Sequence, residues 1–426
     1  MEQTQQLADA RDSAWTPADT NVRSFPHFLK WGLATALTGA LLAMLAVATV
    51  DPYHLFRFVD VAGFNHVKPL PEQYREQIKL AQAKAVRPNM IFLGHSRVEI
   101  GLDPENAQLR QRGFSAYNMA LSGTGISTAQ YMYRGIRDKA APPAAAVVGV
   151  EFLDFLLDPA RAQAAAAAAP APIPAVETWQ WRFDTLFSLG ALSDAARTLG
   201  IQRDPEAQTI TSRGLNPLLE YRKFARQEGY FSIFQQRAQE NAKSLVRRPH
   251  GLTIPGTGTS RDIDELRRML TSMARDGTEV HLLIYPYHAQ LLAMFEQAGL
   301  QPVMEEWKQL LVREVDAVRR REPKARITLW DFSGFSPIQC ERIPPPESRS
   351  ATRWYWEAGH FKSVVGDLIL DRILGRPSPI GFALTADNVE QNRQRIATER
   401  AACLAAYPEV FDSSRALIDA ARRQLR

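Results

Sequence analysis

An uncharged apolar stretch near the N-terminus constrains this chain more than any other feature. The twenty residues from Trp31 to Val50 carry no charged side chain. As a helix, a stretch of this length matches the thickness of the hydrocarbon core of a bilayer. The sequence therefore predicts a transmembrane anchor over residues 28–50, with lipid contacting residues 31–50.

The residues around this stretch bear on its orientation and its fate. Arg23 and Lys30 precede it and Asp51 follows it, which favours a cytoplasmic N-terminus. The small residues at 46–48 also fit a signal-peptidase site, and a buried core helix is a further alternative. The polar leader over residues 1–27, which contains four acidic residues, favours an uncleaved anchor behind a disordered tail.

The composition excludes some classes of function. The chain has 51 basic and 46 acidic residues, and this small excess without a long basic block gives no support for binding nucleic acid. The eight histidines form no helical i, i+4 pair, so we expect no metal site. Cys340 and Cys403 are far apart, and the sequence leaves open whether they pair or remain free thiols.

Short apolar runs alternate with amphipathic segments, which is typical of an α/β fold. Strands are expected at 90–93, 115–121, 145–150, 280–285 and 327–331, and helices at about 71–85, 128–138, 263–274, 304–321 and 363–374. Strands joined mostly by helices predict a five-stranded parallel sheet with right-handed crossovers and helices on both faces.

This alternation also divides the chain into segments. An α/β domain begins at residues 51–155 and resumes at 259–375, interrupted by an insertion over 156–258. The insertion starts with an Ala/Pro-rich stretch at 159–176 and continues as a helical region. Residues 376–426 are expected to form a C-terminal helical extension.

The first candidate for chemistry follows the strand at 90–93. Gly94 ends that strand, and Ser96 stands where the chain should turn into a helix. Ligands of α/β sheets bind at the carboxyl ends of parallel strands, and helix N-terminal N–H groups can stabilise an oxyanion. Ser96 is therefore a candidate nucleophile, although capping the next helix is the common role of a serine in such a turn.

The second candidate is a short block before the helix at 363–374. Glu357 lies three residues before His360, so its carboxylate can reach the imidazole nitrogen that does not face a nucleophile. The alternative is a surface histidine beside a capping glutamate.

Together these blocks resemble the SGNH (GDSL-like) hydrolase superfamily, and above all its membrane-anchored branch of DltD-like and alginate O-acetyltransferase-like proteins. The family's Gly-x-Ser block corresponds to residues 94–96, and its C-terminal Asp-x-x-His block to 357–360. The glycine that follows the family's second strand corresponds to Gly123, at the end of the segment 118–123.

The resemblance implies a flavodoxin-like three-layer fold and a set of roles. Ser96 would be the nucleophile, His360 its base and Glu357 the group that orients His360. The N–H groups of Ser96 and Gly123 would form the oxyanion hole, and no cofactor would be needed. The likeness covers residues 86–155 and 260–375 but neither the insertion nor the last fifty residues.

Two positions depart from the family pattern. Where the family has an asparagine that donates to the oxyanion hole, this chain has Glu151. An ionised carboxylate cannot donate a hydrogen bond, and loss of one such donor costs about a hundredfold in turnover. The replacement of Asp by Glu357 is milder, because the longer side chain can still reach the imidazole.

Five further residues are candidates for binding substrate: Arg97, Asn118, Glu151, His288 and Asp331. The more ordinary expectations are that Arg97 pairs with Glu151, that His288 is a structural residue at the sheet rim, and that Asp331 shapes a turn. His288 is also an alternative base in place of His360.

The sequence and the resemblance together predict a single-pass protein of the bacterial inner membrane with its main domain in the periplasm. Its expected activity is that of an O-acetyltransferase or acetyl esterase acting on a cell-envelope or exported polysaccharide. A multispanning acyltransferase is an expected partner for the transferase reaction. The alternatives are a non-catalytic glycan-binding or assembly subunit, and a flavodoxin-like binding domain in which Ser96 and His360 lie far apart.

Overall fold

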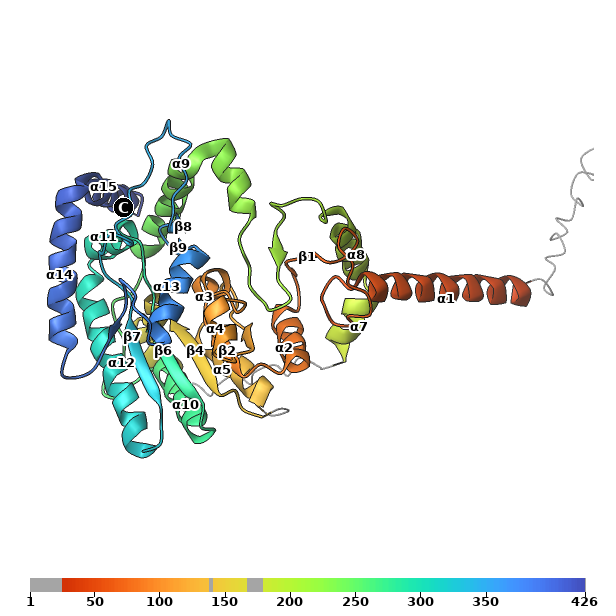
Figure 1. The fold of residues 1–426 in the computed structure, drawn as a ribbon, viewed down its shortest axis with the longest axis horizontal. Helices are drawn as coiled ribbons and strands as arrows, with labels where there is room; N and C mark the ends of the chain where they lie inside the picture. Colours follow the sequence, from red (N-terminus) through yellow and green to blue (C-terminus); the bar gives the residue numbers. More distant parts are fainter. Residues whose placement is uncertain (1–24, 138–140, 167–178, 426) are drawn as a thin grey trace, which may run out of the picture.

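The computed structural model describes residues 25–137, 141–166 and 179–425, and it is an α/β protein built on a mixed six-stranded sheet (Figure 1). The sheet order is β10 (Phe382–Ala383), β7 (Ile327–Asp331), β6 (Glu279–Ile284), β4 (Ala145–Val150), β2 (Met90–Leu93) and β3 (Ala116–Asn118). Strands β3, β2, β4, β6 and β7 are parallel, and β10 pairs with β7 in the antiparallel sense.

The central strands are buried along their whole length. Every residue of β2 and β4 is buried, as expected for parallel strands covered on both faces. The crossover helices α2 (Arg75–Val86), α5 (Ile126–Arg137), α10 (Arg261–Arg275) and α12 (Gln301–Arg321) contact one another in that order. Ser260 caps α10 by accepting the N–H of Ile263, and the helix begins at Arg261, two residues before the predicted bound.

The prediction of five parallel strands is correct for the core of the sheet, but the prediction of an all-parallel sheet is wrong. The added strand β10 has only two residues, too few for an alternating pattern to be visible in the sequence. The strand predicted at 115–121 is shorter in the structure, where β3 runs only from Ala116 to Asn118.

The insertion forms two separately packed parts. Helices α7 (Gln180–Phe187) and α8 (Leu189–Gly200) contact the N-terminal helix, whereas α9 (Glu220–Leu245) contacts β8, α11 and α15 in the main body. Strand β5 (Thr209–Ile210) pairs with β1 (Lys68–Pro69) between them. Of the Ala/Pro-rich stretch, α6 (Pro159–Ala166) is described, and residues 167–176 lie outside the described residues.

The N-terminal helix α1 (Phe25–Val50) projects from the body and is long and apolar enough to span a membrane (Figure 1). It begins three residues before the predicted anchor, so residues 25–27 belong to the helix. The remainder of the predicted disordered tail, residues 1–24, lies outside the described residues.

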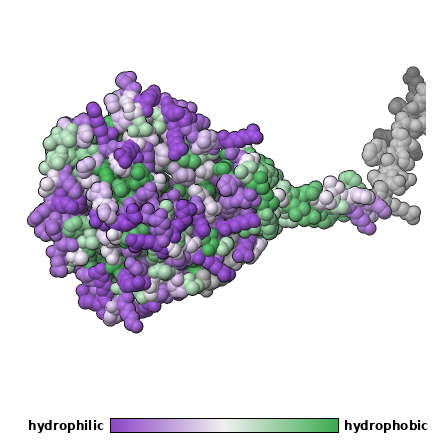
Figure 2. All heavy atoms as spheres, in the orientation of Figure 1, coloured by the Kyte–Doolittle hydropathy of each residue, from purple (hydrophilic) through white to green (hydrophobic). Residues whose placement is uncertain are grey.

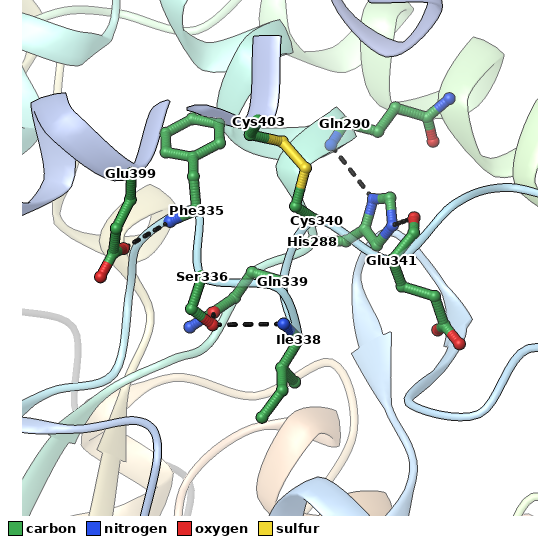
Figure 3. Close-up of a disulfide and its surroundings, with 10 residues drawn as sticks. All are labelled: His288, Gln290, Phe335, Ser336, Ile338, Gln339, Cys340, Glu341, Glu399 and Cys403. Atoms are coloured by element: carbon green, nitrogen blue, oxygen red, sulfur yellow. Dashed lines mark hydrogen bonds between the residues drawn. A yellow bond between two sulfur atoms is a disulfide. The ribbon is translucent and has the colours of Figure 1, made fainter. Parts of the chain in front are cut away.

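The C-terminal extension is helical, as predicted, and is held by a disulfide. Helices α14 (Val389–Ala406) and α15 (Pro408–Arg423) cover the body, and Cys403 of α14 is bonded to Cys340 across a Cα–Cα distance of 6.0 Å (Figure 3). The question that the sequence left open is therefore answered, and the two cysteines pair. The remaining elements are α3 (Ser96–Gly101), α4 (Ala107–Gln111), η1 (Phe152–Phe155), α11 (Ala289–Ala298), β8 (Tyr355–Glu357), β9 (His360–Phe361) and α13 (Ser363–Ile373).

Candidate active site

Ser96 stands at the carboxyl end of β2, where the strand order of the sheet reverses. Strand β2 lies between β3 and β4, and ligands of α/β sheets bind outside the strand ends at such a point. Gly94 makes the turn with a φ of 141°, and a Cβ at this position would lie 2.9 Å from the hydroxyl of Tyr285. Only glycine fits this turn, which delivers Ser96 as the first residue of α3.

Glu357 and His360 face each other across a β-hairpin. Strands β8 and β9 are antiparallel, and these two residues are Cα partners on either side of a turn formed by Ala358 and Gly359. The spacing of three residues thus places the carboxylate beside the imidazole. The sequence predicted this proximity on a loop, and the structure provides it in a hairpin.

The hairpin brings His360 to Ser96. The Oγ of Ser96 lies 2.7 Å from Nε2 of His360, and Nδ1 of His360 is hydrogen-bonded to the Glu357 carboxylate. Two glycines permit this approach. A Cβ on Gly101 would collide with the ring of Phe361, and a Cβ on Gly366 would collide with the carbonyl of Gly101. The alternative in which Ser96 and His360 lie far apart is therefore wrong.

Glu357 is a buried carboxylate that remains ionised. Its side chain is 2% exposed, and it accepts a hydrogen bond of 2.7 Å from the N–H of Gly359. Burial alone would raise the pKa of Glu357, but the His360 ring, the Gly359 N–H and the Arg97 guanidinium together lower it to about 2. The carboxylate can therefore hold the imidazole in one tautomer and stabilise its protonated form.

Arg97 forms a buried ion pair with Glu151, as the sequence suggested. The guanidinium also lies over the rings of Tyr285 and Tyr287, 5.0 Å from the centre of the latter. The Tyr287 hydroxyl donates to Glu151 over 3.0 Å. The charge of Glu151 is thus paired, but the ionised carboxylate is still no donor of a hydrogen bond. With both groups engaged in this pair, the structure gives no support for their binding substrate.

The side chains of His288 and Asn118 are both engaged inside the fold. His288 is fully buried, its Nε2 lies 2.8 Å from the carbonyl of Glu341, and its Nδ1 accepts the N–H of Gln290 (Figure 3). Burial lowers the pKa of His288 to about 4, so the ring is neutral and caps α11. The Asn118 amide is fully buried too and donates to the carbonyls of Val98 and Leu102. With these polar atoms engaged inside the fold, the structure gives no support for substrate contact by either side chain.

Asp331 is likewise a structural residue. It is fully buried, lies 3.1 Å from the ammonium of Lys308, and accepts hydrogen bonds from Ser333 and Asn392. The bond to Ser333 confirms the expected role in the turn after β7. With its carboxylate held by these partners inside the fold, the structure gives no support for a role of Asp331 in binding substrate.

Gly123 lies on a loop that is fastened to α3. Ser122, the preceding residue, donates both its N–H and its hydroxyl to Glu99 of α3. Gly123 itself has a φ of 77°, a conformation that favours glycine. These contacts hold the loop next to the helix that begins at Ser96, as the resemblance requires for a shared oxyanion hole.

The charges that hold this loop were missed by the sequence analysis. Glu99 is fully buried and forms ion pairs of 2.9 Å with both Lys79 and Arg75. Burial would raise the pKa of Glu99, but the two cations and the Ser122 hydrogen bonds lower it to about 2. In the sequence these residues look like the solvated face of a charged helix, so no local signal separates them from surface charges.

A second histidine, which the sequence analysis did not single out, is also within hydrogen-bond distance of the Ser96 hydroxyl. Nδ1 of His95 lies 2.8 Å from Ser96 Oγ. Burial lowers the pKa of His95 below its ordinary value. Among the described residues no carboxylate is hydrogen-bonded to the His95 ring, so it lacks the support that Glu357 gives to His360. Its place next to Ser96 in the sequence was the available signal.

A narrow recess opens beside His95. Its walls are formed by the ends of β2 and β4, the loop at Thr124 and Gly125, and Asp154 of η1. The recess has room for about one water molecule. An oxyanion oxygen is of similar size. Burial and the neighbouring charge of Glu151 raise the pKa of Asp154 to about 7. Below that pH the carboxyl that lines the recess is mostly protonated and can donate a hydrogen bond.

The fold and the site define an α/β protein with a Ser–His–Glu hydrogen-bonded chain at the carboxyl edge of its parallel strands. The protein matches no protein-family model, no curated protein and no solved structure at a significant level. Within the described ranges, His, Cys, Asp and Glu side chains form no cluster of three that could hold a metal ion. The function must therefore be argued from the site itself.

Proposed function

We propose that this chain is a membrane-anchored, extracytoplasmic serine enzyme of the SGNH type that transfers acyl groups to or from a carbohydrate. The observation that carries the proposal is the hydrogen-bonded chain from Ser96 through His360 to Glu357. The parallel strands, in sheet order, appear in the chain as second, first, third, fourth and fifth, which is the flavodoxin-like order and supports the SGNH assignment.

In the first half-reaction Ser96 attacks the carbonyl carbon of an acyl ester. His360 takes the hydroxyl proton at Nε2 as the Oγ–C bond forms, and Glu357 stabilises the resulting imidazolium. The protonated His360 then gives this proton to the departing alcohol oxygen as the ester C–O bond breaks. The product is an acyl ester on Ser96.

In the second half-reaction the acyl group leaves Ser96. His360 removes a proton from water or from a sugar hydroxyl, whose oxygen attacks the acyl carbon, and Ser96 leaves with the proton returned by His360. Water as the acceptor makes the protein an esterase, and a sugar makes it a transferase. As a transferase it would need an acyl donor supplied across the membrane, for which a multispanning acyltransferase is the proposed partner.

The oxyanion of each tetrahedral intermediate needs donors of hydrogen bonds. The N–H of Ser96 is the first, since N–H groups in the first turn of a helix have no partner within the helix. The N–H of Gly123, on the loop before α5, is the second, as the resemblance to the SGNH family implies. The protonated Asp154 is the third, because it lines the recess on the side where the family's asparagine is replaced by Glu151. A neutral carboxyl would thereby do the work of the missing amide.

Two features support an extracytoplasmic location. Helix α1 is long and apolar enough to act as the anchor. The Cys340–Cys403 disulfide is of the kind that forms in oxidising compartments such as the periplasm and is rare in the cytosol. The proposed location is the bacterial inner membrane, with the body in the periplasm.

A serine-directed fluorophosphonate tests the proposal. We expect it to label the full chain in detergent at Ser96, identified by peptide mass, and not the Ser96→Ala variant. The Ser333→Ala variant is the matched control, since this buried serine belongs to the turn after β7 and its loss should leave labelling unchanged. Failure of the folded wild-type chain to be labelled, with equal ester hydrolysis by wild type and Ser96→Ala, would favour the non-catalytic glycan-binding subunit.

A further inference from the structure

Exposed apolar side chains gather next to the point where α1 meets the body. They come from the loop after α1 and from α7 and α8, and we call them the collar: Phe58, Val61, Phe64, Trp179, Phe183, Phe187, Leu189, Leu192 and Leu199. Leu189 is 87% exposed and Trp179 is 65% exposed. The apolar surface of α1 continues onto the body at this junction (Figure 2). A soluble body rarely leaves so many large apolar side chains together in water.

Helix α7 is apolar on its outward face as well as on its inward face. Trp181 and Thr185 point into the body and are buried. Trp179, Phe183 and Phe187 are each four residues apart, so they share the opposite, exposed side. Aromatic side chains of this kind are enriched where proteins meet the headgroup region of a membrane.

The acidic side chains of the two helices are turned away from this surface. Asp184 is the only acidic residue of α7, and Asp194 the only one of α8. Asp184 accepts a hydrogen bond from the Tyr74 hydroxyl, and Asp194 accepts one of 2.6 Å from the Tyr53 hydroxyl. Hydrogen bonds to the two tyrosines hold these carboxylates off the outward faces of α7 and α8. Asp60, which lies between Phe58 and Val61 of the collar, is exposed and is paired with His66.

The collar is fixed in position relative to α1. Val47 and Val50 of α1 are buried in one cluster with Trp181 of α7 and Ala191 of α8. The last carbonyls of the helix are capped as well, since the Asn65 amide donates to Thr49 and Val50 and the Lys68 ammonium donates to Val50 over 2.9 Å. A membrane-spanning α1 therefore brings the collar close to the headgroups, and the tilt of α1 together with the body decides whether the collar side chains enter them.

We propose that the collar is a membrane-binding surface that lies in the headgroup region of the extracytoplasmic leaflet. The inference rests on the part of the proposed function in which α1 crosses a bilayer. Lipid is the occupant because the collar continues the apolar surface of α1, and the end of a spanning helix necessarily lies at the headgroups. The collar would hold the body against the membrane instead of leaving it to swing on a single helix.

Depth measurements with cysteine reporters test this surface. The two native cysteines are paired, so an introduced cysteine is the only free thiol. We would place an environment-sensitive fluorophore on Leu189→Cys in the collar, Leu37→Cys in α1 and Glu390→Cys on α14. The full chain would be reconstituted in vesicles of phosphatidylethanolamine and phosphatidylglycerol that carry a nitroxide on the headgroup or on the acyl chain.

The proposal expects headgroup nitroxides to quench the label at 189 several-fold more than the label at 390, and acyl-chain nitroxides to quench the label at 37. Quenching at 37 with none at 189 overturns the collar and leaves the anchor intact. Absence of quenching at both positions overturns the anchor as well. Either result leaves the chemistry at Ser96 to be judged by its own labelling test.

Paired variants separate the collar from general hydrophobicity. With the reporter on Leu192→Cys, the double variant Phe183→Ser with Phe187→Ser should lose most of its headgroup quenching. Both rings are exposed in the body, and circular dichroism of the variant checks that the fold is kept. The matched control is Leu404→Ser on α14, which also removes an exposed apolar side chain. Equal quenching in the two variants would contradict a role for the collar in binding lipid.

Discussion

Ser96 and His360 are 264 residues apart in the chain, yet Ser96 Oγ lies 2.7 Å from His360 Nε2. The two loops meet because β2 and the β8–β9 hairpin flank α3, and because Gly101 and Gly366 let these segments pack without intervening side chains. The same serine is also within hydrogen-bond distance of His95, so the assignment of the base can be tested directly.

His360→Ala should reduce ester hydrolysis by on the order of a thousandfold or more, whereas His95→Ala should cost less than about tenfold. The reason is that His360 alone has a carboxylate behind it, which stabilises the ring when it takes the proton. Steady-state rates with an activated acetate ester measure the difference, and circular dichroism of both variants controls for folding. The reverse order of effects would make His95 the base.

Glu357 offers a test that joins catalysis to stability. Glu357→Gln should lower turnover about a thousandfold, because an amide can favour the wrong imidazole tautomer, and Glu357→Asp should lower it less. The pKa of Glu357 is about 2 in the folded chain against an ordinary value of 4.5. This depressed pKa contributes stability that is present above pH 4.5 and is lost as the pH falls toward 2. Urea unfolding of Glu357→Gln over that interval should therefore show a weaker loss of stability on acidification than the wild type.

Ionisation of Asp154 should make the rate of ester hydrolysis fall as the pH rises above about 7. Its carboxyl, with a pKa of about 7, is protonated and donates below that pH, and it is ionised and repels an oxyanion above it. Asp154→Asn, whose amide donates at any pH, should remove this decline. Asp154→Ala should cost about a hundredfold at pH 6, as the loss of one oxyanion donor does elsewhere. A wild-type rate in Asp154→Ala at pH 6 would exclude Asp154 from the oxyanion hole.

The loop that carries Gly123 depends on the buried charges around Glu99. Glu99→Gln leaves the fully buried Lys79 without its carboxylate, which should cost about 3–5 kcal/mol in the free energy of unfolding. The double variant Glu99→Gln with Lys79→Met removes both charges and should recover much of this loss. Glu390→Gln, which breaks an exposed ion pair with Arg393, is the control and should leave stability unchanged. Additive effects of the Glu99 and Lys79 substitutions would argue that the two charges do not depend on each other.

The sequence predicted those features of the structure that depend on residues close together in the chain. The strand at 145–150 has the bounds that its continuous apolar run predicts. The strand at 327–331 also has its predicted bounds, with alternate residues fully buried. The Glu357–His360 spacing likewise predicted a contact within one turn. Ion pairs between residues distant in the sequence leave no local pattern. The sequence therefore does not distinguish the buried pair of Lys79 and Glu99 from surface charges.

The sequence also does not predict how a side chain at the end of a strand is oriented. His288 was expected near the rim, and it does follow β6, but its ring turns inward because α11 begins there and needs a cap. The orientation of a side chain at a strand end is thus set by the element that follows, and the strand pattern alone does not predict it.

The Cys340–Cys403 disulfide separates the stability of the body from the chemistry of its site. It closes a segment of 63 residues between the turn after β7 and α14, so its loss should lower the free energy of unfolding by about 4 kcal/mol in the chain-entropy estimate. The paired variant Cys340→Ser with Cys403→Ser should therefore unfold at lower urea, and dithiothreitol should shift the wild type in the same direction while leaving the variant unmoved. Neither cysteine contacts Ser96, His360 or Glu357 through a hydrogen bond, so ester hydrolysis well below the transition should stay within about twofold of wild type. A large loss of hydrolysis in folded Cys340→Ser/Cys403→Ser protein would contradict this separation and show that α14 helps to hold the hairpin that carries His360.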